Sequence, residues 1–204
     1  MASLTLSCIV LTRATRDLSV RRYPPAHLDQ HLQDMQRQGI IEPRQSPWAS
    51  NIVLARKKDG IMRCCIDYRQ LNNCTVGDAY PVPRQDMFLD ALAGSRWYST
   101  CDLRSSFHLV KLDPDTSDKT AFITRRGMFR YRTIPFGLTN TVATFQRLMD
   151  LVLSGVSLSV CICYLDDLIF HSTTLDQHLE NLEMILQKLR GANLKLKPSK
   201  CFFL

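Results

Sequence analysis

Apolar residues near the C-terminal end of the chain recur at the spacing of one helix face. A capping box formed by Thr174 and Gln177 precedes this pattern, and Gly191 follows it. The pattern therefore predicts a helix that begins after Thr174 and ends at Gly191. Its apolar stripe consists of Leu175, Leu179, Leu182, Leu186 and Leu189.

Three further segments have helical patterns, and each ends next to a glycine. The first follows the extended entry Tyr23-Pro24-Pro25 and stops at Gly39, and the others run from Pro81 to Gly94 and from Thr139 to Ser154. The first two are amphipathic, with Leu28, Leu32 and Met35 on one face of the first and Met87, Leu89 and Leu92 among the apolar residues of the second.

The remaining apolar runs are short, and turn residues separate them, as is typical of strands. Pro114 is expected to end one of them, and the Asp-Gly step at Asp59-Gly60 suits a hairpin. The predicted strands are 51–56 with 61–67, 97–103, 107–112, the two arms of a hairpin over 120–134 that turns at 125–127, and 158–163 with 168–171. Mixed strands and helices with several hairpins predict an α+β fold rather than a doubly wound parallel sheet.

Two adjacent carboxylates, Asp166 and Asp167, stand at the apex of the last apolar hairpin, after Tyr164 and Leu165. Neighbouring acids repel each other, and a divalent cation would remove that cost. Taken alone, an Asp-Asp pair is more often a solvated turn. Because strand residues alternate sides, a third carboxylate has to come from another strand, and Asp102 is the candidate, flanked by apolar Cys101 and Leu103.

Charge and cysteine usage narrow the possible partners. The 204 residues have a formal net charge of +7, which suits a polyanion such as nucleic acid. The eight cysteines show no C-x-x-C spacing, which favours free thiols in a reducing compartment over a zinc site or a disulfide framework. No signal peptide or membrane-spanning segment is predicted, so we expect an intracellular, cytoplasmic protein.

A series of short motifs runs in order along residues 24–203. They are Gly39-Ile40-Ile41-Glu42-Pro43, Ser46-Pro47-Trp48-Ala49-Ser50, Lys57-Lys58-Asp59-Gly60, Asp67-Tyr68-Arg69-Gln70-Leu71-Asn72, Asp78-Ala79-Tyr80-Pro81, Asp102-Leu103-Arg104-Ser105, Lys119-Thr120-Ala121-Phe122, Pro135-Phe136-Gly137-Leu138, Ala143-Thr144-Phe145-Gln146 and Tyr164-Leu165-Asp166-Asp167. One such motif would be weak evidence, but the whole series in order is very specific. The series resembles the reverse transcriptase of gypsy-like LTR retrotransposons.

The resemblance implies an RNA-directed DNA polymerase that adds dNTPs to a primer on an RNA or DNA template. Asp102, Asp166 and Asp167 match the catalytic ligands of two Mg²⁺ ions, for which Mn²⁺ can substitute. The other matched residues are Lys57 and Arg63 for the triphosphate, Phe107 as the wall against a 2′-hydroxyl, Phe136 and Gly137 for the nucleotide, and Tyr164 for the primer end. Gln146 matches a position near the template–primer, where a purely structural role is the alternative.

The implied architecture is that of the fingers and palm of a right-hand polymerase, the palm being a ferredoxin-like antiparallel sheet with helices on one face. The expected divisions are a poorly patterned segment 1–22, fingers over 23–77 and 113–140, and palm over 78–112 and 141–204. Primer grip, thumb, RNase H and integrase are expected only in a parent polyprotein. The alternative is a catalytically weak or inactive remnant that binds nucleic acid or a protein partner.

Two positions depart from the family pattern. Ser106 stands where relatives usually have glycine, and Thr141-Val142 stands where they have Ala-Pro. A lost glycine costs about 1 kcal/mol if the backbone there needs a positive φ. The sequence therefore leaves the geometry of the nucleotide pocket in question, although every matched carboxylate is present.

Overall fold

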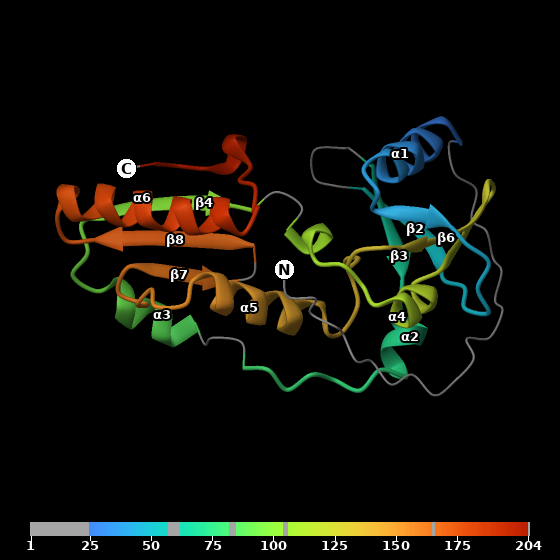
Figure 1. The fold of residues 1–204 in the computed structure, drawn as a ribbon, viewed down its shortest axis with the longest axis horizontal. Helices are drawn as coiled ribbons and strands as arrows, with labels where there is room; N and C mark the ends of the chain where they lie inside the picture. Colours follow the sequence, from blue (N-terminus) through green and yellow to red (C-terminus); the bar gives the residue numbers. More distant parts are fainter. Residues whose placement is uncertain (1–24, 57–61, 82–84, 104–105, 165, 204) are drawn as a thin grey trace. The chain divides into compact units, whose positions relative to one another are not determined.

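The computed structural model describes residues 25–56, 62–81, 85–103, 106–164 and 166–203, and the chain divides into two compact units (Figure 1). The first contains Met1–Asp78 and Phe107–Thr141, and the second Ala79–Ser106 and Val142–Leu204. The fingers and palm expected from the sequence divide after residues 77, 112 and 140, and these two units divide after residues 78, 106 and 141. Backbone hydrogen bonds join residues 107–112 to the first unit: Ile134 N–H donates to Val110 O (2.9 Å) and Leu112 N–H to Arg132 O (2.9 Å).

The first unit combines an antiparallel three-stranded sheet, a two-stranded hairpin and short helices. The sheet has the order β1-β6-β5, and β2 pairs antiparallel with β3. The elements are α1 (Pro25–Arg37), β1 (Ile41–Pro43), β2 (Asn51–Arg56), β3 (Met62–Asp67), α2 (Arg69–Asn73), η1 (Ser106–Leu109, shared with the second unit), α4 (Pro114–Lys119), β5 (Phe122–Thr124) and β6 (Gly127–Tyr131).

Aromatic and aliphatic side chains form the core of the first unit. Phe122 and Tyr68 are buried, and the Tyr68 hydroxyl donates to Thr120 O at 2.9 Å, so its polar end is satisfied. Arg130 joins the sheet to α4 because its guanidinium donates to Glu42 Oε1 and Asp118 Oδ1, each at 2.6 Å. The two charged hydrogen bonds of this guanidinium hold β1 and β6 against α4.

The second unit is built on the antiparallel sheet β4-β8-β7 (Figure 1). Beyond β4, two isolated antiparallel bridges, Thr100 with Phe202 and Leu103 with Leu196, extend the sheet with the last described segment. The elements are α3 (Gln85–Leu92), β4 (Trp97–Asp102), α5 (Thr141–Val152), β7 (Cys161–Tyr164), β8 (Asp167–Ser172), α6 (Leu175–Gly191) and η2 (Pro198–Lys200).

Helix α6 begins where its capping box predicts, with the Thr174 hydroxyl accepting a hydrogen bond from Gln177 N–H. Its buried face differs from the predicted leucine stripe, because Leu175 and Leu179 are exposed. The residues that pack inward are His178, Leu182, Ile185 and Leu189. His178 takes a core position because Ser99 of β4 offers its ring a hydrogen-bond partner, with Nε2 and Oγ 2.9 Å apart.

Two other predictions of local structure were wrong. Residues 107–112 were expected to be extended, but they begin inside the 3₁₀ helix η1. Pro114 was expected to end a strand, but it opens α4, since Asp113 caps that helix by accepting a hydrogen bond from Asp115 N–H. The other predicted helices and hairpins are present within a few residues of their expected ends. None of the helices that the structure describes is long and apolar enough to cross a membrane.

Candidate active site

The hairpin between β7 and β8 presents the paired carboxylates at its tip. Tyr164 and Asp167 are Cα partners, and Asp166 lies in the turn between them. The side chains of Cys161, Ile162 and Cys163 in β7 are buried, and so are those of Leu168 and Phe170 in β8. The buried arms fix the hairpin, while Asp166 remains half-buried and Asp167 exposed at its tip.

The register of the sheet brings Asp102 to this tip. Asp102 is the last residue of β4, and its Cα partner in β8 is Asp167. The next residue of the chain, Leu103, donates its N–H to Asp166 O at 3.0 Å. Directly opposite residues of an antiparallel pair place their side chains on one face. The fold thus brings the backbone of Asp102 beside the turn that carries Asp166 and Asp167.

A lysine that the sequence analysis did not select completes this cluster. Lys200 Nζ forms an ion pair with Asp102 Oδ2, and the Asp102 side chain is only 15 % exposed. The hydrogen bond to Asp102 and its charge raise the pKa of Lys200, and the charges of Asp167 and Asp166 raise it further. One cation therefore lies in the field of all three carboxylates.

Backbone pairing, rather than a local motif, takes Lys200 to the carboxylates. Lys197 N–H donates to Asp102 O at 2.8 Å, and η2 then turns the chain so that Phe202 returns alongside β4. The contact between Lys200 and Asp102 depends on the pairing of residues 197–202 with β4, so no local sequence pattern could predict it.

The donor atoms at this tip are those of a hard divalent cation. Carboxylate oxygens are the protein ligands that Mg²⁺ prefers, completed by water and substrate phosphates. Within the described ranges, no three Asp, Glu, His or Cys side chains are grouped so that they could hold a metal ion by themselves. The Lys200 ammonium nevertheless marks a point where these carboxylates attract positive charge. Their chemistry therefore fits the predicted ions, with oxygen ligands from a substrate completing the set.

The residues predicted to bind the nucleotide belong to the first unit. Phe107 is 5 % exposed, and its ring meets that of Phe136 edge-on, with centroids 4.9 Å apart. Gly137 has φ +92°, and its carbonyl accepts a hydrogen bond from Asn72 Nδ2 at 2.7 Å. Lys57 lies outside the described residues, and Arg63 is described only by its backbone in β3, opposite Ala55.

The two residues predicted to lie near primer and template have different surroundings. Tyr164, half-buried, packs edge-on against Phe88 with ring centroids 5.6 Å apart. Gln146 is only 2 % exposed, and its Nε2 donates to Asp150 Oδ1 at 3.0 Å. Its burial favours the structural alternative, because a buried amide within α5 cannot reach nucleic acid directly.

The departures from the family pattern cause no backbone strain. Asn193 alone among the described non-glycine residues has a positive φ, so Ser106 adopts a conformation open to any residue. Thr141 uses its hydroxyl, which donates to Pro135 O at 3.2 Å at the start of α5. The possible 1 kcal/mol cost of losing glycine at Ser106 therefore does not arise.

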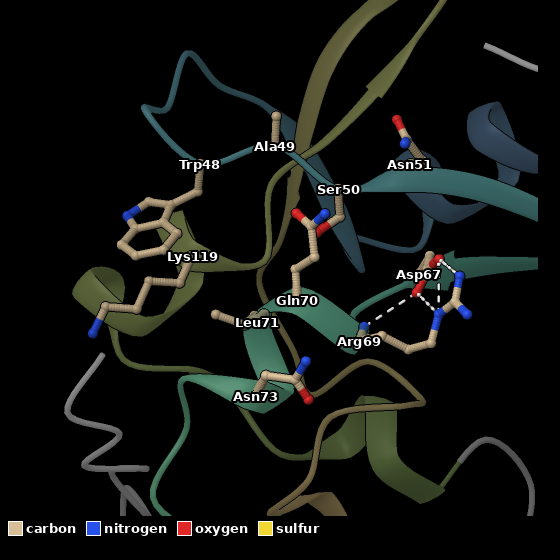
Figure 2. A pocket seen from close by; sticks show the side chains of 10 residues that line it. All are labelled: Trp48, Ala49, Ser50, Asn51, Asp67, Arg69, Gln70, Leu71, Asn73 and Lys119. Carbon is tan, nitrogen blue, oxygen red and sulfur yellow. Dashed lines mark hydrogen bonds and ion pairs between the residues drawn. The ribbon is translucent and has the colours of Figure 1, made fainter. Parts of the chain in front are cut away.

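A hollow of about 340 Å³ lies within the first unit, and none of Asp102, Asp166 and Asp167 lines it (Figure 2). Beside it, Arg69 and Asp67 form a bidentate pair, with Nη2 and Oδ2 2.6 Å apart. The hydrogen bond from Arg69 holds the pKa of Asp67 below its usual range. The hollow is lined by Trp48, Ala49, Ser50, Asn51, Asp67, Arg69, Gln70, Leu71, Asn73 and Lys119.

Comparison with solved structures supports the fold. The chain superposes on the foamy viral protease-reverse transcriptase in complex with double-stranded DNA with a TM-score of 0.87, at 24 % identity, covering 97 % of this chain and 35 % of that one. A foamy viral protease-reverse transcriptase in complex with an RNA/DNA hybrid also gives a TM-score of 0.87, at 23 % identity, over 97 % of this chain and 26 % of that one. The mixed α+β fold is thus that of the foamy viral enzyme.

Sequence relatives are retroelement polyproteins. The chain is 37 % identical to the retrovirus-related Pol polyprotein from transposon 297 of Drosophila melanogaster, over 98 % of this chain and 20 % of that protein. It is 32 % identical to the transposon Tf2-3 polyprotein of Schizosaccharomyces pombe, over 96 % of this chain and 15 % of that protein. The chain thus spans a fifth or less of these relatives.

The family model described as reverse transcriptase (RNA-dependent DNA polymerase) matches residues 55–204, which contain all three aspartates. This match and the polyprotein relatives confirm the resemblance predicted from the motifs. The chain therefore belongs to the reverse transcriptase family and is related to the Pol polyproteins of retrotransposons.

Proposed function

We propose that this chain is the fingers-and-palm core of an RNA-directed DNA polymerase, which transfers a nucleotide from a dNTP to a primer 3′-hydroxyl. The first unit corresponds to the fingers and the second, with its β4-β8-β7 sheet, to the palm. The observation that carries the proposal is the antiparallel register that sets Asp102 opposite Asp167, beside Asp166. Three carboxylates on one sheet edge suit two-metal phosphoryl transfer.

In the proposed mechanism Asp102 and Asp166 would be the principal ligands of two Mg²⁺ ions, with Asp167 in support. Ions held there would supply the positive charge that favours deprotonation of the primer 3′-hydroxyl and stabilises the transferred phosphoryl group. The chain itself contributes the rigid placement of Asp102, because this residue ends β4 between the buried side chains of Cys101 and Leu103. Lys200 has to release the Asp102 carboxylate before this residue can act as a ligand.

The nucleotide is proposed to bind to residues of the first unit. Lys57 supplies a point charge and Arg63 a bidentate fork for the triphosphate oxygens. Phe107 forms the wall that collides with a 2′-hydroxyl, and its edge-on packing against Phe136 supports a fixed ring position. The open backbone at Gly137 and the Phe136 ring, 40 % exposed, offer surfaces for the nucleotide.

A primed RNA or DNA template is the proposed polyanionic partner, and the formal charge of +7 supports it. Related folds have been solved with double-stranded DNA and with an RNA/DNA hybrid. The exposed face of Tyr164 is proposed to lie near the primer end, and Trp48 in the hollow of the first unit to offer an aromatic surface for a base. RNase H and integrase modules are expected in a longer parent polyprotein.

Primer extension tests the proposal. The chain is incubated with Mg²⁺, a primed RNA template and dNTPs, beside Asp166→Asn and the matched surface variant Asp90→Asn on α3. We expect extension by the natural chain and by Asp90→Asn, and none by Asp166→Asn, because only Asp166 is a proposed ligand. Extension by Asp166→Asn equal to that of the natural chain would contradict the proposed roles.

The inactive-remnant alternative predicts a different pattern, in which template–primer binding falls with salt yet is the same in Asp102→Asn and Asp166→Asn. The proposed polymerase instead binds template–primer more tightly when Mg²⁺ and the complementary dNTP are both present. Measuring binding with the complementary and a non-complementary dNTP separates the two functions.

A further inference from the structure

Two cysteines face each other at the edge of the second unit's sheet. Thr100 and Phe202 exchange both backbone hydrogen bonds, at 2.8 and 2.9 Å, which makes them a hydrogen-bonded antiparallel pair. Counting one residue along each strand from this pair sets Cys101 opposite Cys201. Cys201 has the extended backbone that this pairing requires, with φ −98° and ψ 135°.

The position of this cysteine pair suits a cross-strand disulfide. The pair next to a hydrogen-bonded one is a non-hydrogen-bonded pair, whose Cα atoms are about 4.5 Å apart and whose side chains lie on the same face. Disulfides need Cα atoms about 4.4–6.8 Å apart. Burial, followed by the Cys201 thiol, raises the pKa of the Cys101 thiol to about 12, as expected of two side chains that this pairing sets side by side.

The two thiols differ in access to solvent. Cys101 is 1 % exposed, on the same face of β4 as Ser99, which hydrogen-bonds to His178 of α6. Cys201 is half-buried, and its thiol donates to Lys197 O at 3.3 Å. A small oxidant in solvent therefore reaches the Cys201 thiol first. The buried Cys101 thiol is then the resolving thiol, which forms the disulfide.

Each cysteine is next in sequence to one member of the Asp102–Lys200 ion pair. Cys101 precedes Asp102 in β4, and Cys201 follows Lys200, whose ammonium pairs with Asp102. A covalent link between them would fasten the 198–202 segment along β4. It would thereby hold Lys200 against the carboxylate that a divalent ion needs.

We propose that Cys101 and Cys201 are a redox-active pair, which peroxide closes to a disulfide and thiols reopen, so that oxidation weakens cation binding at Asp102. Hydrogen peroxide oxidises the Cys201 thiol to a sulfenic acid and is itself reduced to water. The Cys101 sulfur then attacks that sulfur, forming the S–S bond and releasing the second water. In a reducing compartment such a link is a transient, regulatory one.

Peptide mapping of the 204-residue chain tests the pair directly. After mild hydrogen peroxide treatment we expect an intact mass lower by two hydrogens. Alkylation should then label two fewer thiols than in the untreated chain, and digestion should give a peptide linked between Cys101 and Cys201. Dithiothreitol should restore both thiols. Finding no such peptide while other cysteines are oxidised would overturn the proposal.

A matched variant separates this pair from general thiol oxidation. The Cys74 thiol also donates to a carbonyl four residues earlier, Gln70 O at 3.4 Å, so Cys74→Ser is the control for Cys201→Ser. We expect Cys74→Ser to form the linked peptide and Cys201→Ser to lose it. The loss of two thiols from Cys201→Ser at the natural rate would contradict the assignment.

The regulatory consequence has its own readout, which needs no template or activity. Titration with Mn²⁺, followed by electron paramagnetic resonance, should give an affinity about threefold lower for the oxidised chain, the size expected from fixing one partly exposed ion pair. Equal affinities would overturn the regulatory part. This part rests on the proposed metal site, whereas the peptide map does not, so failure of one can be told from failure of the other.

Discussion

Replacing Lys200 with glutamine removes the cation that pairs with Asp102 and keeps a side chain of similar length. Lys200 is 55 % exposed and Asp102 15 %, so water partly screens the pair. An incoming divalent ion has to displace this ammonium before it binds the Asp102 carboxylate. Lys200→Gln should therefore bind a divalent ion more tightly than the natural chain does.

The size of the effect follows from the exposure of the pair. Ion pairs at the protein surface contribute about 0.2–1 kcal/mol, and the upper end corresponds to a factor of about five in an equilibrium constant. We therefore expect Mn²⁺ affinity to rise by about two- to fivefold in Lys200→Gln. The free energy of unfolding should fall by no more than about 1 kcal/mol for the same reason.

Isothermal titration with Mn²⁺ measures the affinity, and urea unfolding measures the stability. Lys195→Gln is the matched control, because Lys195 is an exposed lysine of the same segment. It should leave the Mn²⁺ affinity within experimental error of the natural value. An unchanged or weaker affinity in Lys200→Gln would refute the view that Lys200 competes with the metal.

Three further predictions concern the framework of the two units. Burial lowers the pKa of His178 in the folded chain, and His171 lowers it further. As the pH falls, His178 is therefore protonated in the unfolded chain before it is protonated in the folded one. The free energy of unfolding should therefore fall as the pH drops below about 6.5. In His178→Gln, urea unfolding at several pH values should show a smaller decrease. The same decrease in the variant would exclude His178 as its source. Leu168→Ala, at a fully buried position of the central strand, should cost about 2.7–5 kcal/mol in urea unfolding, against no more than about 0.5 kcal/mol for Leu151→Ala, whose leucine is 61 % exposed; similar losses would argue against this core. Gly137→Ala should lower the free energy of unfolding by about 1 kcal/mol, because φ is +92° there and the added methyl group meets nothing closer than 3.9 Å. Thermal unfolding of the variant and the natural chain measures this loss, and equal melting temperatures would disprove the strain.

Local sequence determined much of the secondary structure. The capping box at Thr174, the hairpins around residues 57–60 and 125–127, and the apolar arms beside Asp166 and Asp167 carry their signals in a few neighbouring residues. The motifs also identified the family, which the family model and the polyprotein relatives confirm. Short elements such as α4 were missed, because six residues with one proline hold too little periodicity to stand out.

The burial of α6 and the contacts around Asp102 were decided by tertiary structure. Leucine spacing predicted one face for α6, yet His178 rather than Leu179 lies inside, because Ser99 of a distant strand satisfies its ring. Likewise, the sequence by itself selected Asp102, Asp166 and Asp167 as a set. Only the antiparallel register sets Asp102 opposite Asp167, and only the return of the last described segment along β4 brings Lys200 to Asp102 and Cys201 to Cys101. Such pairings join residues far apart in the chain through backbone hydrogen bonds, which leave no signature in the local order of side chains.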